Sequence, residues 1–201
     1  MDERNVFVLA DRALLRVIEQ IRDDQWDLEI PDWFPMRRTG ETVVLRTIIN
    51  YHAYDDSWVP DMLAGKTMDE AGKTRFDGDL LGDAPKSAFA RIVDLACTAA
   101  LGLDDPARPV HTSFGDYPAN EYLWQVSSFR GLRAHDIAKL IGVDTTLPAD
   151  LVQGLWDEIA PHAEEWRAIE VYGPAIEVGA DASLQDRLLG LTGREPDGSA
   201  T

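Results

Sequence analysis

The sequence predicts an all-α fold, an antiparallel four-helix bundle with a C-terminal helical extension, and it allows one short β pair. Four long segments carry apolar residues at three- and four-residue spacing, which is typical of helices that bury one face. Long connections containing proline and glycine separate them. The chain has 201 residues, of which 45% are apolar, so it can bury one sizeable core.

The first predicted helix spans residues 6–21, because apolar residues recur there with charged residues between them. The second spans residues 42–65 and ends on a glycine, which suits a left-handed C-terminal cap. Pro60 lies inside this second helix, where its ring removes one backbone hydrogen bond. We therefore expect a kink beside Asp55 and Asp56.

Two further helices complete the predicted bundle. One has Asp83 as its N-cap and ends at Gly102. It contains Cys97, the only cysteine of the chain, which we interpret as a small core residue. The other spans residues 119–141. Between them, residues 109–115 are rich in β-forming residues and precede a turn, which favours an extended segment there.

Residues 146–196 are predicted to pack as an extension on the bundle formed by residues 1–145. The extension contains a helix, a short segment of alternating residues and a last helix, at residues 148–170, 175–178 and 184–191. The tail at 197–201 is polar, and we expect it to be disordered.

The charge balance disfavours nucleic acid and membranes as partners. The chain has 19 Lys and Arg residues against 36 Asp and Glu, which leaves a formal charge of −17 and a field that repels phosphates and anionic bilayers. No apolar run approaches the roughly 20 residues that span a bilayer, and the first residues lack the order of a secretory signal. We therefore expect a cytoplasmic protein. Glycine-rich phosphate loops and the nucleophile elbow of hydrolases are also absent from the sequence.

Six short segments carry a family resemblance that covers nearly the whole chain. They are DDQWD at 23–27, NYHA at 50–53, MLAG at 62–65, HDIAKLIG at 135–142, QDRLL at 185–189 and GREP at 193–196. In order and spacing they resemble the mycothiol-dependent maleylpyruvate isomerase family of DinB-like helical bundles. The last two segments resemble the signature of an uncharacterised metal-binding branch of that family.

This resemblance implies a divalent metal, often zinc, held by a histidine of the second helix and by two ligands one turn apart on the fourth. Some relatives use the ion to activate a low-molecular-weight thiol such as mycothiol, because a metal lowers the pKa of a thiol. His52 matches the first ligand position. The other two positions hold Phe129 and Arg133, and arginine has no lone pair to donate.

His135 is the remaining metal candidate on the fourth predicted helix. It lies two residues beyond Arg133, which rotates it about 200° around the helix axis, so we expect it to face the surface or a secondary interface. His111, in the extended segment, and His162, in the extension, are weaker candidates.

The arginine at a ligand position suggests a different site. Asp55 and Asp56 follow His52 by three and four residues and share its helical face. We hypothesise that Arg133 takes the place of the ion and pairs with Asp55 or Asp56, because a buried guanidinium needs a carboxylate. The alternative is that all three charges are solvated near the bundle ends.

Two functions from different classes follow. One is an enzyme, a metal- and thiol-dependent isomerase or transferase in which His52 is the metal ligand or general base and Arg133 assists. The alternative is a non-catalytic module that binds a small molecule, in which Arg133 receives an anionic ligand and Asp55 and Asp56 border the site. A homodimer is compatible with either function.

Overall fold

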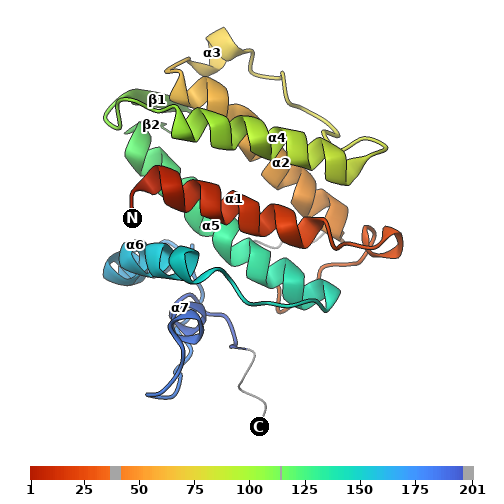
Figure 1. Ribbon diagram of the computed structural model, residues 1–201, viewed down its shortest axis with the longest axis vertical. Helices are drawn as coiled ribbons and strands as arrows, with labels where there is room; N and C mark the ends of the chain where they lie inside the picture. Colours follow the sequence, from red (N-terminus) through yellow and green to blue (C-terminus); the bar gives the residue numbers. More distant parts are fainter. Residues whose placement is uncertain (37–41, 114, 197–201) are drawn as a thin grey trace.

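The computed structural model describes residues 1–36, 42–113 and 115–196, so the tail at 197–201 lies outside the described residues. Within this part the chain is mostly helical, with one two-stranded antiparallel sheet (Figure 1). The elements in chain order are α1 (Glu3–Ile18), η1 (Asp23–Gln25), α2 (Leu45–Leu63), α3 (Met68–Ala71), α4 (Pro85–Leu101), β1 (Pro109–Thr112), β2 (Gly115–Pro118), α5 (Ala119–Ile141), α6 (Ala149–Ala168) and α7 (Leu184–Leu191).

The four long helices α1, α2, α4 and α5 surround the main core. α1 packs against α5 and α4, and α2 packs against α4. Phe7, Leu14 and Ile18 recur on one face of α1 and are fully buried there. Each such side chain contributes roughly 1.5–3 kcal/mol when it leaves water. Figure 1 shows α6 and α7 on the outer side of α1 and α5, and α6 contacts both of those helices.

The helix directions differ from a simple antiparallel order. Gln25, just after α1, donates a hydrogen bond to the carbonyl of Ile141 at the end of α5, so α1 and α5 run in the same direction. Arg46, at the start of α2, donates to the carbonyl of Gly82 before α4, so α2 and α4 also run in parallel. Figure 1 shows the two pairs running in opposite directions. The predicted antiparallel arrangement therefore holds between the pairs and is wrong within them.

Long-range contacts and caps move the starts of the first two long helices. α1 begins at Glu3, three residues earlier than predicted, because the Asp2 side chain caps it by accepting from the backbone amide of Asn5. α2 begins at Leu45, three residues late, because Val44 is held extended in a β-bridge with Glu29. The predicted bounds of α5 are confirmed.

The β pair forms at the predicted extended segment. β1 and β2 make a hairpin in which Pro109 lies opposite Pro118, directly before α5. The alternating segment at 175–178 has no strand, although the amide of Ile176 donates to the carbonyl of Gly190. None of the helices in the described ranges has the length and apolar composition that crossing a membrane requires.

Glycine allows α6 to approach α5 and α1 closely. A Cβ atom at Gly131 of α5 would lie 2.6 Å from a methyl carbon of Leu155. A Cβ atom at Gly154 of α6 would lie 2.6 Å from a methyl carbon of Val6. Both distances are far shorter than van der Waals contact, so a larger residue would require the Leu155 or Val6 side chain to move.

Candidate functional site

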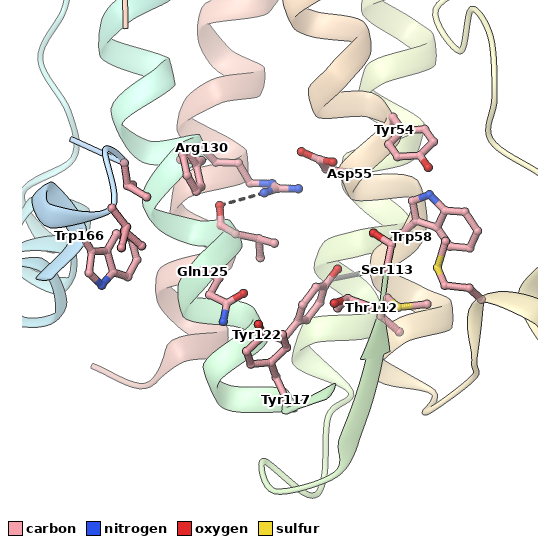
Figure 2. A pocket seen from close by; sticks show the side chains of 16 residues that line it. Tyr54, Asp55, Trp58, Thr112, Ser113, Tyr117, Tyr122, Gln125, Arg130 and Trp166 are labelled. Carbon is pink, nitrogen blue, oxygen red and sulfur yellow. Dashed lines mark hydrogen bonds between the residues drawn. The ribbon is translucent and has the colours of Figure 1, made fainter. Parts of the chain in front are cut away.

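A cavity of about 540 Å³ lies between α2, α5, the hairpin and the end of α6 (Figure 2). Small-molecule sites in proteins typically have volumes of roughly 300–1,000 Å³. The lining residues are Tyr54, Asp55, Trp58, Met62, Met68, Thr112, Ser113, Tyr117, Tyr122, Gln125, Val126, Phe129, Arg130, Trp166, Ile169 and Val171.

Helical spacing explains why α5 supplies five of these residues. Tyr122, Gln125, Val126, Phe129 and Arg130 follow one another at three- and one-residue steps, which places them along one stripe of the helix. Phe129 is 47% exposed, so this stripe also reaches the mouth of the cavity. Phe129, which occupies the second implied metal-ligand position, therefore lines the cavity.

Aromatic side chains give the cavity firm walls. Trp58 of α2 packs edge-on against Tyr54, with ring centroids 6.1 Å apart, and against Phe76 at 4.9 Å. On the opposite side, Trp166 of α6 stacks on Tyr172 with centroids 5.5 Å apart. Because these rings are fixed by other rings, the cavity is largely preformed.

Arg130 closes the inner end of the cavity and is only 1% exposed. Its Nε lies 2.9 Å from Asp11 Oδ1 of α1 and donates to Asp56 Oδ1 of α2 at 2.5 Å. Its Nη1 donates to the carbonyl of Val126 at 2.9 Å, and its Nη2 contacts Asp56. We call Asp11, Asp56 and Arg130 the Arg130 cluster.

Two buried carboxyls share one guanidinium in the Arg130 cluster. Burial raises the pKa of Asp56 to about 6, although Arg130 acts against the shift. Burial and the nearby Asp56 also raise the pKa of Asp11 well above its ordinary value. Oδ2 of Asp56 is buried without a hydrogen-bond partner among the described residues, which suits a protonated oxygen. The cluster therefore retains a proton into the neutral pH range more readily than isolated carboxyls would.

Asp55 lies next to Asp56 in the sequence but faces the cavity, as Figure 2 shows. Adjacent residues of a helix point about 100° apart, so one carboxyl enters the core and the other the cavity. Within the described part of the chain, the Asp55 carboxylate forms no hydrogen bond or ion pair. The surrounding protein raises its pKa by desolvation, against the attraction of Arg130.

A second buried cluster lies two turns along α5 and outside the cavity. Arg194, from the segment after α7, donates to both carboxylate oxygens of Asp136, at 2.9 and 3.0 Å. Arg133 lies 3.4 Å from Asp136 Oδ2 and stacks over the Phe34 ring at 4.6 Å. Burial alone would raise the pKa of Asp136, but Arg194 and the other donors lower it to about 2. We call Asp136, Arg133 and Arg194 the Asp136 cluster.

The structure therefore corrects the hypothesis that Arg133 pairs with Asp55 or Asp56. Asp56 pairs with Arg130, one turn earlier on α5, while Arg133 donates to the carbonyl of Pro35 at 2.9 Å and contacts Asp136. Burial lowers the pKa of Arg133 to about 10. The alternative of three solvated charges holds only for Asp55, because Asp56 and Arg133 are both buried.

His52 points into the interior, as its spacing predicts, and is 7% exposed. Its Nδ1 is buried and has no hydrogen-bond partner in the described ranges. Burial, Arg133 and Arg130 lower its pKa well below the ordinary value, so the ring is neutral. The positive charges of Arg133 and Arg130 thus act on the imidazole, and Asp136 opposes them. Residues 1–36, 42–113 and 115–196 contain no group of three His, Cys, Asp or Glu side chains that could hold a metal, so the implied zinc does not fit this donor set.

Of the two positions expected for His135, the surface and a secondary interface, the surface is wrong. The side chain is 1% exposed, and its Nδ1 lies 3.7 Å from Asp136 Oδ1. α5 is covered by α1 and by α6, so a side chain turned away from the cavity is buried as well. His111 instead contacts Asp116 across the hairpin at 2.9 Å.

Two other residues that the sequence singles out lie outside the cavity lining. His162 is half exposed on α6, with its Nδ1 3.5 Å from Glu165. Cys97 is buried, and its thiol lies 3.9 Å from Asp11 Oδ2. Burial raises the pKa of Cys97 to about 12, which keeps it a neutral thiol and agrees with a core residue.

Comparisons with known proteins identify no relative of this chain. No protein-family model, no curated protein and no solved structure matches it. Its function is therefore inferred from the cavity and the charged groups around it.

Proposed function

We propose that this chain is a binding module for a small organic molecule, which occupies the cavity between α2 and α5. The observation that carries the proposal is a preformed cavity of about 540 Å³ whose walls are mainly aromatic and apolar. Of its described lining residues, only Asp55 and Arg130 are charged. Apolar walls with few polar groups are typical of sites that bind small molecules and fix their orientation.

We also propose that the four long helices form a DinB-like bundle with a C-terminal extension. The parallel pairs α1–α5 and α2–α4, and the long connection between α2 and α4, support this proposal, because bundles with a crossover connection have such pairs. A metal- and thiol-dependent isomerase or transferase remains the reaction class that the resemblance implies. The donor set around His52 gives it no support, so no step of the proposal uses a metal or mycothiol.

The charged groups of the proposed site are Asp55 and Arg130, in place of Arg133. Arg133 lies in the Asp136 cluster and outside the cavity lining, so it is not placed to receive a ligand there. Asp55 is one of the residues that line the cavity, while Asp56 lies outside the lining and forms an ion pair with Arg130.

A cavity-filling variant tests the proposal. We expect 2-(2-naphthyl)ethanol, a neutral aromatic probe, to bind the parent chain and to change the fluorescence of Trp58 and Trp166 in the cavity walls. Gln125→Trp places a large side chain in the cavity and should abolish the binding. Leu95→Trp adds the same side chain at a position of α4 that is 64% exposed, and should leave it unchanged.

Two outcomes would contradict the proposal. Equal probe binding by Gln125→Trp and the parent, with both chains folded by circular dichroism, would place the probe elsewhere. One zinc ion per chain that is lost in His52→Ala would instead favour the metal-dependent enzyme.

A further inference from the structure

We propose that the cavity selects an organic cation, an ammonium group carried on an aromatic or aliphatic body, and that Asp55 is its counter-ion. The inference rests on the proposed function, because it names the chemical class of the molecule that the cavity binds. Four features support it: the compensated charge of Arg130, the negative charge around it, an Asp55 carboxylate with no hydrogen-bond or ion-pair partner among the described residues, and the aromatic rings beside that carboxylate.

The charge of Arg130 is already compensated by two buried carboxyls, although its Nη2 forms no hydrogen bond among the described residues. Nε is shared between Asp11 and Asp56, Nη2 contacts Asp56, and Nη1 donates to the carbonyl of Val126. A ligand carboxylate at this guanidinium would be a third carboxyl beside one cation that is only 1% exposed. The carboxyls of Asp11 and Asp56 would therefore repel it.

The inner end of the cavity is negative overall. The carboxyls of Asp11 and Asp56 contact the single guanidinium of Arg130, and the exposed carboxylate of Asp55 also lines the cavity. If one buried carboxyl carries a proton, two negative charges still face one positive charge. The sign therefore does not depend on which buried acid is protonated, and it attracts a cation.

Asp55 has no hydrogen-bond or ion-pair partner in residues 1–36, 42–113 and 115–196. It enters the cavity from α2, opposite Arg130 on α5, as Figure 2 shows. The Asp55 residue is exposed to solvent, and the neighbouring walls still raise the pKa of its carboxyl by partial desolvation. An ammonium group would supply the charge-assisted hydrogen bond that no described residue provides.

Aromatic rings lie beside this carboxylate. Tyr54 precedes it, and Trp58 follows it by one helical turn, so both belong to the same wall as Asp55. The faces of such rings attract cations, most strongly in tryptophan. An ammonium group at Asp55 would thus meet a carboxylate and aromatic rings together, while its apolar body fills the rest of the cavity.

Three probes with one naphthyl body separate this inference from the proposed function. They are 2-(2-naphthyl)ethylamine, 2-(2-naphthyl)ethanol and 2-naphthylacetate, which are positive, neutral and negative at pH 7.5. We expect the amine to bind roughly tenfold or more tightly than the alcohol, which corresponds to one charge-assisted hydrogen bond, and the acetate to bind most weakly. Isothermal titration measures the three dissociation constants.

A matched pair of variants assigns the preference to Asp55. Asp55→Asn should weaken amine binding to the level of the alcohol and leave alcohol binding unchanged. Because Asp55 has no partner to lose among the described residues, this variant should fold like the parent. Asp83→Asn makes the same chemical change at an exposed residue before α4, at the opposite end of that helix from the hairpin, and should alter neither constant.

The outcomes distinguish the two claims. Equal binding of amine and alcohol overturns the cation preference and leaves the small-molecule cavity standing. Tightest binding of the acetate overturns the preference and makes Arg130 the receiving group. Failure of all three probes to bind overturns the proposed function and this inference with it.

Discussion

Two buried charge clusters lie on the same helix, six residues apart, and have opposite composition. The Arg130 cluster has two carboxyls around one guanidinium, and the Asp136 cluster has two guanidiniums around one carboxylate. Both are deeply buried, yet the pKa of Asp56 is raised to about 6 and that of Asp136 is lowered to about 2. Burial is thus common to both clusters, and the ratio of carboxyls to guanidiniums decides whether the pKa of the aspartate is raised or lowered.

The difference also separates two roles. The acid-rich cluster borders the cavity and gives its inner end a negative sign. The cation-rich cluster joins α5 to the segment after α7 through the two hydrogen bonds from Arg194 to Asp136. We infer that the first cluster sets the charge at the inner end of the cavity, while the second attaches the C-terminal segment to the helices.

Removing the shared cation should have the largest effect. Arg130→Met leaves two buried carboxyls without a partner, and we expect the free energy of unfolding to fall by about 3–5 kcal/mol in urea denaturation. Replacing Asp11 and Asp56 by leucine in the same chain removes the stranded carboxyls and should recover most of the loss. A single Arg130→Met variant as stable as the parent would contradict the charge assignment of this cluster.

Removing the shared anion of the other cluster should have a smaller effect. Asp136→Asn leaves two guanidiniums, but Arg194 is already 10% exposed and can turn toward water. We expect a loss of about 2–3 kcal/mol. Hydrogen exchange should also increase in residues 192–196 before it increases in α5. Simultaneous opening of both segments would show that Asp136 does not attach the C-terminal segment.

The two clusters should respond to acid in opposite ways, and this is the smallest expected effect. The pKa of Asp56 is raised by folding, so its contribution to stability is complete below about pH 4 and is lost as the pH rises through about 6. The pKa of Asp136 is lowered by folding, so its contribution is present above about pH 4 and is lost as the pH falls through about 2.

Urea denaturation between pH 3 and pH 7 tests this contrast. Asp56→Asn should remove a change on the order of 1–3 kcal/mol between pH 4 and 6.5, and Asp136→Asn should remove one below pH 4. His52 works against Asp56, because its lowered pKa costs stability as the pH falls below about 6.5. Each variant is therefore compared with the parent at every pH, and identical slopes would contradict the contrast.

Local patterns predicted the long helices well, and their directions poorly. The bounds of α5 follow from one continuous apolar stripe and its glycine cap, Gly142, which are properties of the segment itself. The parallel direction of α2 and α4 depends on the path of the connection between them, and the late start of α2 depends on the bridge from Val44 to Glu29. Neither the path of this connection nor the bridge can be predicted from the residues next to each helix.

The candidate site likewise has features that local spacing predicts and features that depend on how the helices pack. The inward position of His52 follows from its spacing, whereas the partner of Asp56 depends on how α2 and α5 are rotated against each other. One signal was present in the sequence: Asp11 lies three residues before Leu14 on the buried stripe of α1 and indicates a buried charge. The burial of His135 could not be predicted from its helix alone, because α6 and α1 both cover α5.

The glycines at Gly131 and Gly154 have a consequence for ligand size. They set the spacing of α6 from α5 and α1, and the end of α6 and the residues after it provide Trp166, Ile169 and Val171 to one wall. The width of the cavity thus depends on the close approach of the Leu155 side chain to Gly131 and of the Val6 side chain to Gly154, at positions outside the cavity lining. Under the proposed function, substitutions at these two glycines would change the preferred size of the ligand while every residue that meets the ligand stays the same.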